Sequence, residues 1–224
     1  VGATGNDDNG DGSGHVRVYQ YSIAESGWVQ LGLDIRGEAA GDVAGVCSLS
    51  ADGNTVAVSG PGNDDNGENS GHVRVYKYSV AESGWEQLGL DIRGEAAGDM
   101  IGDRRSTSIS ADGLTVAIGG YYNDGNGSNS GHARVFRYIG TEWVQLGVDI
   151  DGEAAGDYFG YECSLSSDGN TVAISALLND GNGNDSGHVR VFTIAEDIQK
   201  VEYMVTVSGD PDVFVFSSED NELD

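Results

Sequence analysis

The sequence has little proline, little cysteine and few aromatic residues. Among 224 residues there are two prolines, two cysteines and 8% aromatic side chains, against 36 glycines. No apolar stretch approaches the 18 or so residues that a transmembrane helix needs. Helical periodicity is absent as well, and short alternating segments separated by glycine predict many short strands and turns. We therefore expect an all-β chain with no membrane insertion.

Positive charge is also scarce. Lysine and arginine number 11 against 37 acidic residues, which gives a formal net charge of −26. Such a field repels phosphate backbones, so nucleic acid is not expected as a partner. The carboxylates favour divalent cations or cationic surfaces, although a solvated acidic surface that keeps a secreted protein soluble explains them equally well.

The two cysteines occupy the same place in different repeats. Cys47 and Cys163 each begin the tetrapeptide Cys-Ser-Leu-Ser, which is an apolar strand context. Such a context suits buried free thiols, and we favour these over a disulfide.

Three sequence blocks recur with a period of roughly 57 residues. The first reads Ser-Gly-His-Val-Arg-Val-Tyr and begins, with small changes, at Ser13, Ser70, Ser130 and Ser186. The second, Trp-x-Gln-Leu-Gly-x-Asp-Ile-x-Gly-Glu-Ala-Ala-Gly-Asp, begins at Trp28, Trp85 and Trp143. The third, Ser-x-Asp-Gly-x-Thr-Val-Ala, ends at Ala57, Ala117 and Ala173.

Each repeat predicts four antiparallel strands. In the third repeat, alternation marks strands at residues 106–110, 115–119, 132–138 and 143–150. Asp112-Gly113 is expected to join the first two, because this pair accommodates the positive φ of a tight primed turn. A polar loop at residues 123–130 joins the second strand to the third.

Four strands per unit, with no unit able to cover both of its faces, are the pattern of a propeller blade. We predict a β-propeller with about four blades visible, at residues 1–41, 42–98, 99–156 and 157–194. Residues 195–218 are predicted to form a hairpin that completes the last blade or opens another domain, and residues 219–224 a disordered acidic tail. Four blades are few for a propeller, so we expect a larger parent ring or assembly with other copies. Separately, we expect an export signal that lies upstream or has been removed.

These units resemble FG-GAP repeats, the blades of the integrin α-chain propeller and of related secreted proteins. The resemblance rests on Gly-Asp-Tyr-Phe-Gly at residues 156–160, on Ser59-Gly60-Pro61 and Val1-Gly2-Ala3, and on the aromatic end of the third strand. It implies a calcium-associated propeller, here a divergent member. The family's calcium loop joins the first strand to the second, whereas the acidic loop here joins the second to the third. The Phe-Gly pair of the family motif is present at Phe159-Gly160 and is replaced by other residues in the other repeats of this chain.

Four oxygen-rich loops, beginning at Asn6, Asn63, Asn123 and Asn179, are the candidate calcium sites. Calcium takes six to eight hard oxygens, which alternate positions of a tight loop supply. The first two loops are expected to bind more tightly, because their third ligand is a carboxylate; alternatively, these residues only close Asx turns. The predicted ligands are Asp7, Asn9, Asp11, Asp64, Asn66, Glu68, Asp124, Asn126, Ser128, Asp180, Asn182 and Asn184.

Two of these loops also contain N-glycosylation sequons. They are Asn126-Gly127-Ser128 and Asn184-Asp185-Ser186. A glycan on Asn126 or Asn184 would suit a secreted eukaryotic protein.

The repeated histidines and arginines are predicted to be structural. Equivalent residues of neighbouring blades lie too far apart for several histidines to converge on one centre. Arginines within a strand between blades need a carboxylate or a carbonyl as partner. The residues are His15, His72, His132 and His188, with Arg17, Arg74, Arg134 and Arg190, and the expected partners are Glu38, Asp42, Glu95, Asp99, Glu153 and Asp157.

Positions that differ between repeats are the candidate partner-binding residues, because a binding site breaks internal symmetry. Exposed aromatic and aliphatic side chains would suit a protein or a sugar ring, although local packing beneath the loops explains them equally well. They are Tyr121, Tyr122, Leu177, Leu178, Arg104 and Arg105.

No catalytic triad, phosphate loop or dinucleotide fingerprint is present, and we expect a binding protein that is not an enzyme. The expected function is an extracellular or cell-surface adhesion or assembly module with calcium-supported loops. Its ligand would be a protein, a glycan or other copies of itself. The alternatives are a lectin-like propeller and a polysaccharide-active enzyme built on a pair of carboxylates.

Overall fold

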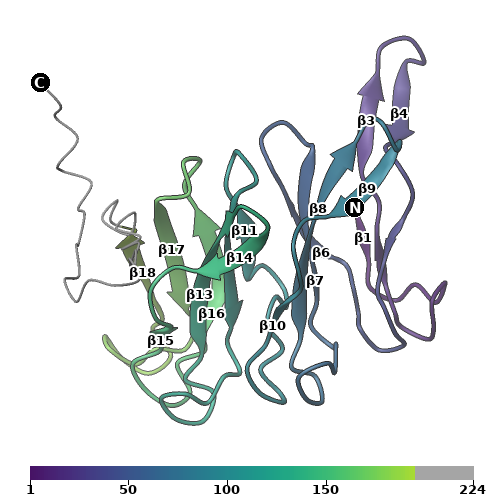
Figure 1. Cartoon of the computed structure of the whole chain (residues 1–224). Helices are drawn as coiled ribbons and strands as arrows, with labels where there is room; N and C mark the ends of the chain where they lie inside the picture. Colours follow the sequence, from purple (N-terminus) through teal and green to yellow (C-terminus); the bar gives the residue numbers. More distant parts are fainter. Residues whose placement is uncertain (195–224) are drawn as a thin grey trace, which may run out of the picture. The chain divides into compact units, whose positions relative to one another are not determined.

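The computed structural model describes residues 1–194. The hairpin predicted at residues 195–218 and the tail predicted at 219–224 lie outside the described residues. Every regular element in the described range is a β-strand (Figure 1). Accordingly, no helix in this part of the chain is long and apolar enough to span a membrane.

The strands form a series of antiparallel sheets. The first sheet joins β1 (Gly2–Ala3), β2 (His15–Val16) and β5 (Ile35–Arg36), and a separate hairpin pairs β3 (Tyr19–Ser22) with β4 (Gly27–Gln30). The second has the order β10 (Ile92–Arg93), β8 (His72–Ser79), β7 (Thr55–Gly60) and β6 (Val46–Leu49), and β9 (Gly84–Gln87) also pairs with β8.

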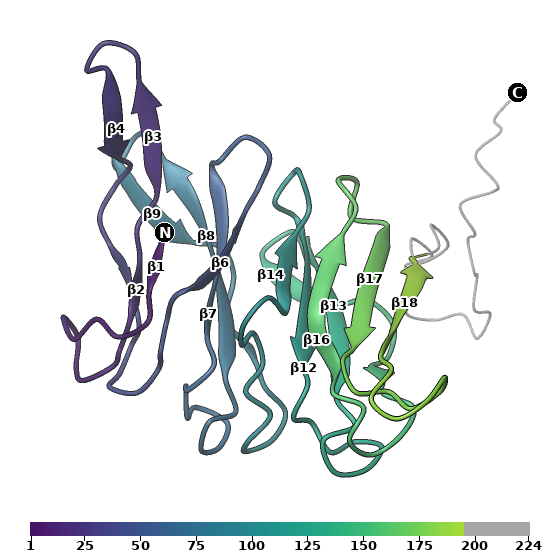
Figure 2. The same ribbon diagram turned by 180° about the vertical axis from the view of Figure 1, so that it is seen from behind.

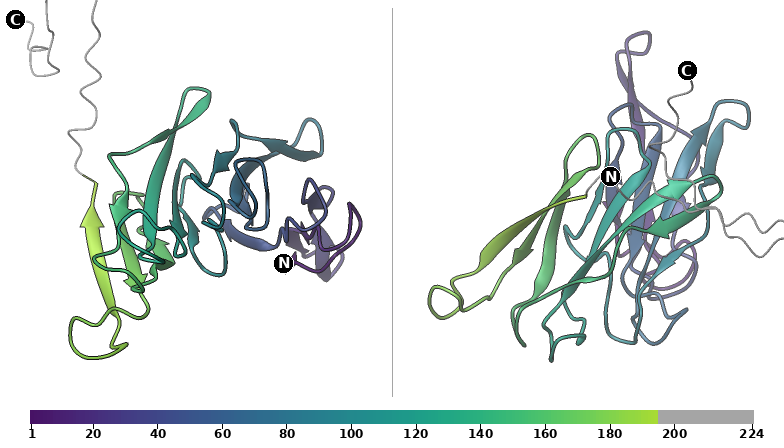
Figure 3. Two further views of the ribbon diagram at one scale, coloured as in Figure 1. Left: turned by 90° about the horizontal axis from the view of Figure 1, so that it is seen from below. Right: turned by 60° about the vertical axis from the view of Figure 1, so that its left-hand side comes forward.

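The other two sheets repeat this pattern. The third has the order β11 (Thr107–Ile109), β12 (Thr115–Gly120), β13 (His132–Ile139) and β14 (Glu142–Gln145), and β15 (Ile150–Asp151) also pairs with β13. The fourth joins β16 (Phe159–Leu165), β17 (Thr171–Ala176) and β18 (His188–Thr193). Figure 3 shows the sheets following one another in chain order, from purple to yellow-green.

The predicted fourth strand of each blade is interrupted. In the third sheet, Phe136 of β13 faces Gln145 of β14, whereas Ala133 faces Ile150 of β15. Four residues, 146–149, therefore oppose two on β13. Gly147 lies within this bulge and has a φ of 73°, a backbone conformation that is unfavourable for residues with a Cβ atom.

The connection between the first two strands also differs from the prediction. Ser110 and Thr115 close the hairpin, so the loop has four residues and is not a two-residue primed turn. Gly113 alone has a positive φ, 75°. The Asp112 carboxylate accepts hydrogen bonds from the Ser110 hydroxyl at 2.6 Å and from the Leu114 amide at 2.9 Å, which stabilises the longer loop.

The sheets pack face to face through small β-branched side chains. Successive residues of β7 point to opposite faces. Val56 and Val58 join a core with Val16 of the first sheet, while Ala57 joins a core with Val116 of the third. All six residues of β7 are buried, and β12 repeats this burial. At the next boundary β12 and β16 lie side by side (Figure 2).

The second and third sheets are each fastened to the preceding sheet by a tryptophan. The Trp85 indole N–H donates to the Leu31 carbonyl at 2.8 Å, and the Trp143 N–H donates to the Leu88 carbonyl at 2.6 Å. Trp28, in the first repeat, is 70% exposed. The described sheets do not close into a ring, so this part of the chain is an all-β, partial propeller.

Candidate functional site

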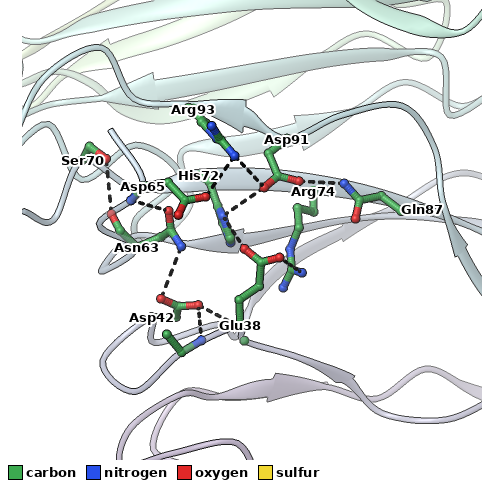
Figure 4. Close-up of polar contacts among 12 residues, drawn as sticks. Glu38, Asp42, Asn63, Asp65, Ser70, His72, Arg74, Gln87, Asp91 and Arg93 are labelled. Atoms are coloured by element: carbon green, nitrogen blue, oxygen red, sulfur yellow. Dashed lines mark hydrogen bonds and ion pairs between the residues drawn. The ribbon is translucent and has the colours of Figure 1, made fainter. Parts of the chain in front are cut away.

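Repeated clusters of polar side chains lie at the boundaries between sheets, and the second repeat has the fullest set (Figure 4). His72 begins β8, and its side chain is 1% exposed. Gly60, opposite it on β7, makes room for the ring, because a Cβ at Gly60 would lie 2.8 Å from His72 Nε2.

Glu38 reaches this cluster from the preceding repeat, in the turn that follows β5. Its Oε1 lies 3.1 Å from Nη1 of Arg74, and its Oε2 lies 3.7 Å from Nδ1 of His72. Arg74 Nη2 also donates to the Arg36 carbonyl at 2.7 Å. Arg74 thus links the first sheet to the second. Glu38 is one of the partners that were predicted for the repeated arginines.

The same contact recurs along the chain. Arg134 approaches Glu95, and Arg190 approaches Glu153, each with an Nη1–Oε1 distance of 3.6 Å. Within residues 1–194, Arg17 contacts no glutamate of another repeat. It binds Asp34 of its own repeat at 2.9 and 2.8 Å, and this pairing lowers the pKa of Asp34 to about 2.

The aspartates expected to bind these arginines have another role. Asp42 Oδ2 accepts the backbone amides of Glu38 at 2.7 Å and Ala39 at 2.9 Å, so it folds the turn that presents Glu38. Asp42 Oδ1 also accepts Asn63 Nδ2 of the next repeat at 3.4 Å. The hydrogen-bond partners of Asp42 are therefore amide groups and not the expected arginine. Asp99 and Asp157 bind equivalent amides.

Burial sets the protonation of the cluster. Loss of hydration, followed by repulsion from Arg74, lowers the pKa of His72, so its imidazole is neutral at pH 7. Loss of hydration also raises the pKa of Glu38, and this outweighs the attraction of Arg74. The pKa values of His132 and Glu95 shift in the same directions, with burial again the largest cause.

The loops predicted to bind calcium all connect the second strand of a sheet to the third. In each, the first aspartate closes the loop: Asp7 Oδ1 accepts the Gly12 amide at 2.8 Å, and Asp64 Oδ1 accepts the Asn69 amide at 2.7 Å. Asp124 and Asp180 make the equivalent bonds. The second carboxylate oxygen of Asp7 and Asp64 has no hydrogen bond from the protein within residues 1–194. The asparagine before each of these aspartates makes an Asx turn, because Asn6 Oδ1 accepts the Asp8 amide at 3.0 Å and Asn63 Oδ1 accepts the Asp65 amide at 3.1 Å. The loops are therefore hydrogen-bonded turns in which some carboxylate oxygens remain without a hydrogen bond from the described part of the chain.

The second predicted ligand of the first three loops ties each of them to its own repeat. Asn66 Nδ2 donates to the carbonyls of Gly94 at 2.7 Å and Glu95 at 3.1 Å. Asn9 and Asn126 do the same with their own turns. The third predicted ligands, Asp11, Glu68, Ser128 and Asn184, are exposed, as is Asn182 of the fourth loop.

The two glycosylation candidates differ in their surroundings. Both hydrogens of Asn126 Nδ2 are engaged by carbonyls, at 2.8 Å from Gly152 O and 3.1 Å from Glu153 O. A glycan would replace one of them. Asn184 is exposed and contacts only the side chain of Asp185, at 2.8 Å. The geometry favours Asn184 over Asn126.

Tyrosines gather at the boundary between the third and fourth sheets. The ring of Tyr121 lies 4.3 Å from Tyr122, 5.9 Å from Tyr158 and 5.2 Å from Tyr161, between centroids. Tyr121 is 3% exposed, which corrects the expectation of an exposed side chain. Its hydroxyl donates to Asp103 Oδ2 at 2.6 Å and accepts Arg104 Nε at 3.2 Å, so it packs beneath the loop.

Tyr122 borders a surface hollow of about 600 Å³. The turn at residues 95–100 lines one side, and residues 122–125 with Ser128 and Asn129 line the other. Its lining residues therefore include one aromatic residue, Tyr122, and the acidic residues Glu95, Asp99 and Asp124, of which Asp99 is buried. Of the other candidate binding residues, Leu178 is half-buried, and Leu177, Arg104 and Arg105 are exposed.

The cysteines are free thiols, as predicted. Cys163 is buried, and this burial raises the pKa of its thiol to about 12. Cys47 is half-buried beside the core between the first and second sheets.

The fourth repeat matches a known family. Residues 148–192, from the end of the third sheet through most of β18, match the FG-GAP repeat family. The chain carries an FG-GAP repeat. The match includes Phe159-Gly160, on which the predicted resemblance rested. Phe159 is fully buried, and Gly160 has a φ of 87°.

Solved structures are similar to this chain only at low identity. TolB from Acinetobacter baumannii is 12% identical with a TM-score of 0.41, over 81% of this chain and 38% of TolB. Hydrazine synthase of Kuenenia stuttgartiensis (14%, 0.42) and the tricorn protease (11%, 0.42) match over 81% of this chain and 43% and 16% of theirs. The chain spans less than half the length of each. No curated protein matches it in sequence.

Sequence reasoning missed two carboxylates at the boundary between the first and second sheets. Asp65 follows the predicted ligand Asp64 by one residue, and Asp91 lies in the repeated Gly-x-Asp-Ile segment. Both approach His72 in the structure. The repetition of Asp34, Asp91 and Asp149 at one position before the last strand was the available signal.

Proposed function

We propose that this chain is an extracellular binding module whose loop edge contacts a protein or glycan ligand, with calcium supporting the loops. The observation that carries the proposal is the hollow beside Tyr122. It is lined by a turn and an acidic loop of successive repeats. The loops that join β7 to β8 and β12 to β13 lie at the lower end of the sheets in Figure 1. The aromatic ring of the hollow has no counterpart in the second repeat, where Gly62 stands. A binding site is expected where repeats differ in this way.

The repeated boundary supports a binding role. The Arg–Glu and Trp–carbonyl contacts hold successive sheets in a fixed relation. They thereby present the loops as one continuous rim, whose side chains supply hydroxyl, carboxylate and aromatic contacts. The carboxylates and tyrosine of the hollow also suit a sugar face, which favours a lectin-like propeller as the second candidate.

The test is ligand binding in millimolar calcium, using a glycan array and a panel of matrix and cell-surface proteins. Tyr122→Ala is expected to weaken binding of the selected ligand about tenfold or more, since buried aromatic anchors dominate interface energies. Tyr21→Ala is the matched control, because Tyr21 is 53% exposed and lies outside the hollow.

Equal affinity of the Tyr122→Ala and parent chains would remove the hollow as the binding site. A glycan as the selected ligand would favour the lectin-like alternative over protein adhesion. Turnover of any polysaccharide would contradict a purely binding function.

A further inference from the structure

A buried imidazole nitrogen faces a group of carboxylates at the first boundary between sheets. Nδ1 of His72 has no hydrogen-bond partner within residues 1–194, and the side chain is 1% exposed. It lies 3.7 Å from Glu38 Oε2 and 3.8 Å from Asp91 Oδ2, which is too far for hydrogen bonds. A buried polar atom without a partner is costly, so this arrangement calls for a missing ligand.

Asp65 completes the group from the neighbouring acidic loop. One donor atom from each of Glu38, Asp65, His72 and Asp91 lies within 4.8 Å of the other three. Four ligands at bond lengths of about 2.1 Å around a tetrahedral ion are about 3.4 Å from one another. The observed separations therefore leave room for one ion, and small side-chain rotations would close the shell.

We propose that Glu38, Asp65, His72 and Asp91 bind one divalent transition-metal ion of the zinc class. The imidazole decides the class of metal, because calcium and magnesium take oxygen ligands whereas zinc and its neighbours accept nitrogen with carboxylate oxygen. The site is distinct from the predicted calcium ligands, and it does not depend on the proposed binding function.

Each carboxylate of this set is already held by a second side chain. Gln87 Nε2 donates to Asp91 Oδ1 at 2.7 Å, and Arg74 Nη1 lies 3.1 Å from Glu38 Oε1. Arg93 Nη2 lies 3.1 Å from Asp65 Oδ2. Such outer contacts orient metal ligands and reduce the repulsion among them before the ion arrives.

The other repeats lack part of the set. In the third repeat Glu95, His132 and Asp149 gather in the same way, but Gly125 stands where the second repeat has Asp65. In the first repeat Asp8, His15 and Asp34 have no earlier glutamate in this chain, and Arg17 binds Asp34. Within the described residues only the second repeat supplies four ligands, so it is the tightest site.

An ion at this position would cross-link two blades. Glu38 belongs to the turn after β5, whereas the other three ligands belong to the second repeat. Binding therefore holds that turn against β8. The melting temperature is expected to rise with zinc concentration, since the ion binds only the folded arrangement.

The experiment is isothermal titration of the metal-stripped chain with Zn²⁺, in excess calcium to occupy oxygen-only sites. Binding of Co²⁺, followed by its visible absorption, reports nitrogen and oxygen coordination. We expect one tight site per chain. Asp65→Gly, which recreates the loop of the third repeat, and His72→Gln are each expected to weaken it about 100-fold or more, as removing an outer-sphere partner alone costs 10–100-fold.

Asp64→Asn is the matched control, because Asp64 neighbours Asp65 but lies outside the cluster. This variant should leave zinc affinity unchanged while it weakens calcium binding. The experiment can therefore contradict the zinc site without contradicting the calcium site, and the reverse. Zinc affinity that is unchanged in both Asp65→Gly and His72→Gln, or the absence of any saturable site, would overturn the proposal. Asp65→Gly retains a backbone that the third repeat already adopts, which keeps the test valid if His72→Gln fails to fold.

Discussion

Gly131→Ala is expected to lower the free energy of unfolding by roughly 2–5 kcal/mol. Gly131 has a φ of 75°, which costs a residue with a Cβ about 1–2 kcal/mol. An added Cβ would also lie 2.0 Å from the Phe159 carbonyl oxygen, at the close contact between the third and fourth sheets. Relieving such overlap costs about 1–3 kcal/mol more. Denaturant unfolding followed by circular dichroism measures the difference.

Gly156→Ala separates the two causes. Gly156 has a similar φ of 86°, but an added Cβ meets no atom within 4 Å. Its loss is therefore limited to the backbone term of about 1–2 kcal/mol. Equal losses for the two variants would show that the sheets do not approach each other at Gly131.

Trp143→Ala is expected to destabilise the chain by about 3 kcal/mol, whereas Trp28→Ala costs less than about 1 kcal/mol. The two tryptophans begin the same sequence block, but only Trp143 packs on a preceding sheet, where its N–H donates to the Leu88 carbonyl. Trp28 is 70% exposed. Trp143 is half-buried against the core, so its truncation loses these packing contacts and the hydrogen bond, while a surface change usually costs little.

Thermal or denaturant unfolding of the two variants tests this contrast. A loss for Trp28→Ala as large as that for Trp143→Ala would mean that the first repeat has a packing partner that the structure does not show. A small loss for Trp143→Ala would mean that the indole does not fasten the third sheet to the second.

Much of the fold was predictable because the same pattern of strands and turns occurs in each repeat. Alternating valines with Asp-Gly and Asn-Asp segments predicted the strand order, and β12 and β13 lie within one residue of their predicted bounds. The pairing of Arg74 with Glu38 was also predictable, since a buried arginine needs an anion. The interruption of the last strand was not, because it depends on a glycine bulge that leaves the apolar alternation intact.

The polar clusters were less predictable because their members come from different repeats. His72 was predicted as structural on the ground that histidines of different blades cannot meet. The structure instead brings carboxylates to it, including Glu38 from the preceding repeat. Tyr121 was expected to be exposed, but Tyr158 and Tyr161 of the following repeat cover it. Such contacts depend on how closely the sheets approach, which a single repeat does not encode.

We propose that calcium supports the acidic loop edge of these blades, and thermal melting with calcium or a chelator tests this proposal most directly. At free calcium about 100 times the dissociation constant, each independent site adds about 2.7 kcal/mol to the free energy of unfolding. Asp7→Asn with Asp11→Asn should remove most of one site's share, while Asp180→Asn with Asp185→Asn, in the carboxylate-poorer fourth loop, should matter less. A melting temperature unmoved by millimolar calcium and by chelator would contradict the claim and leave these loops as hydrogen-bonded turns.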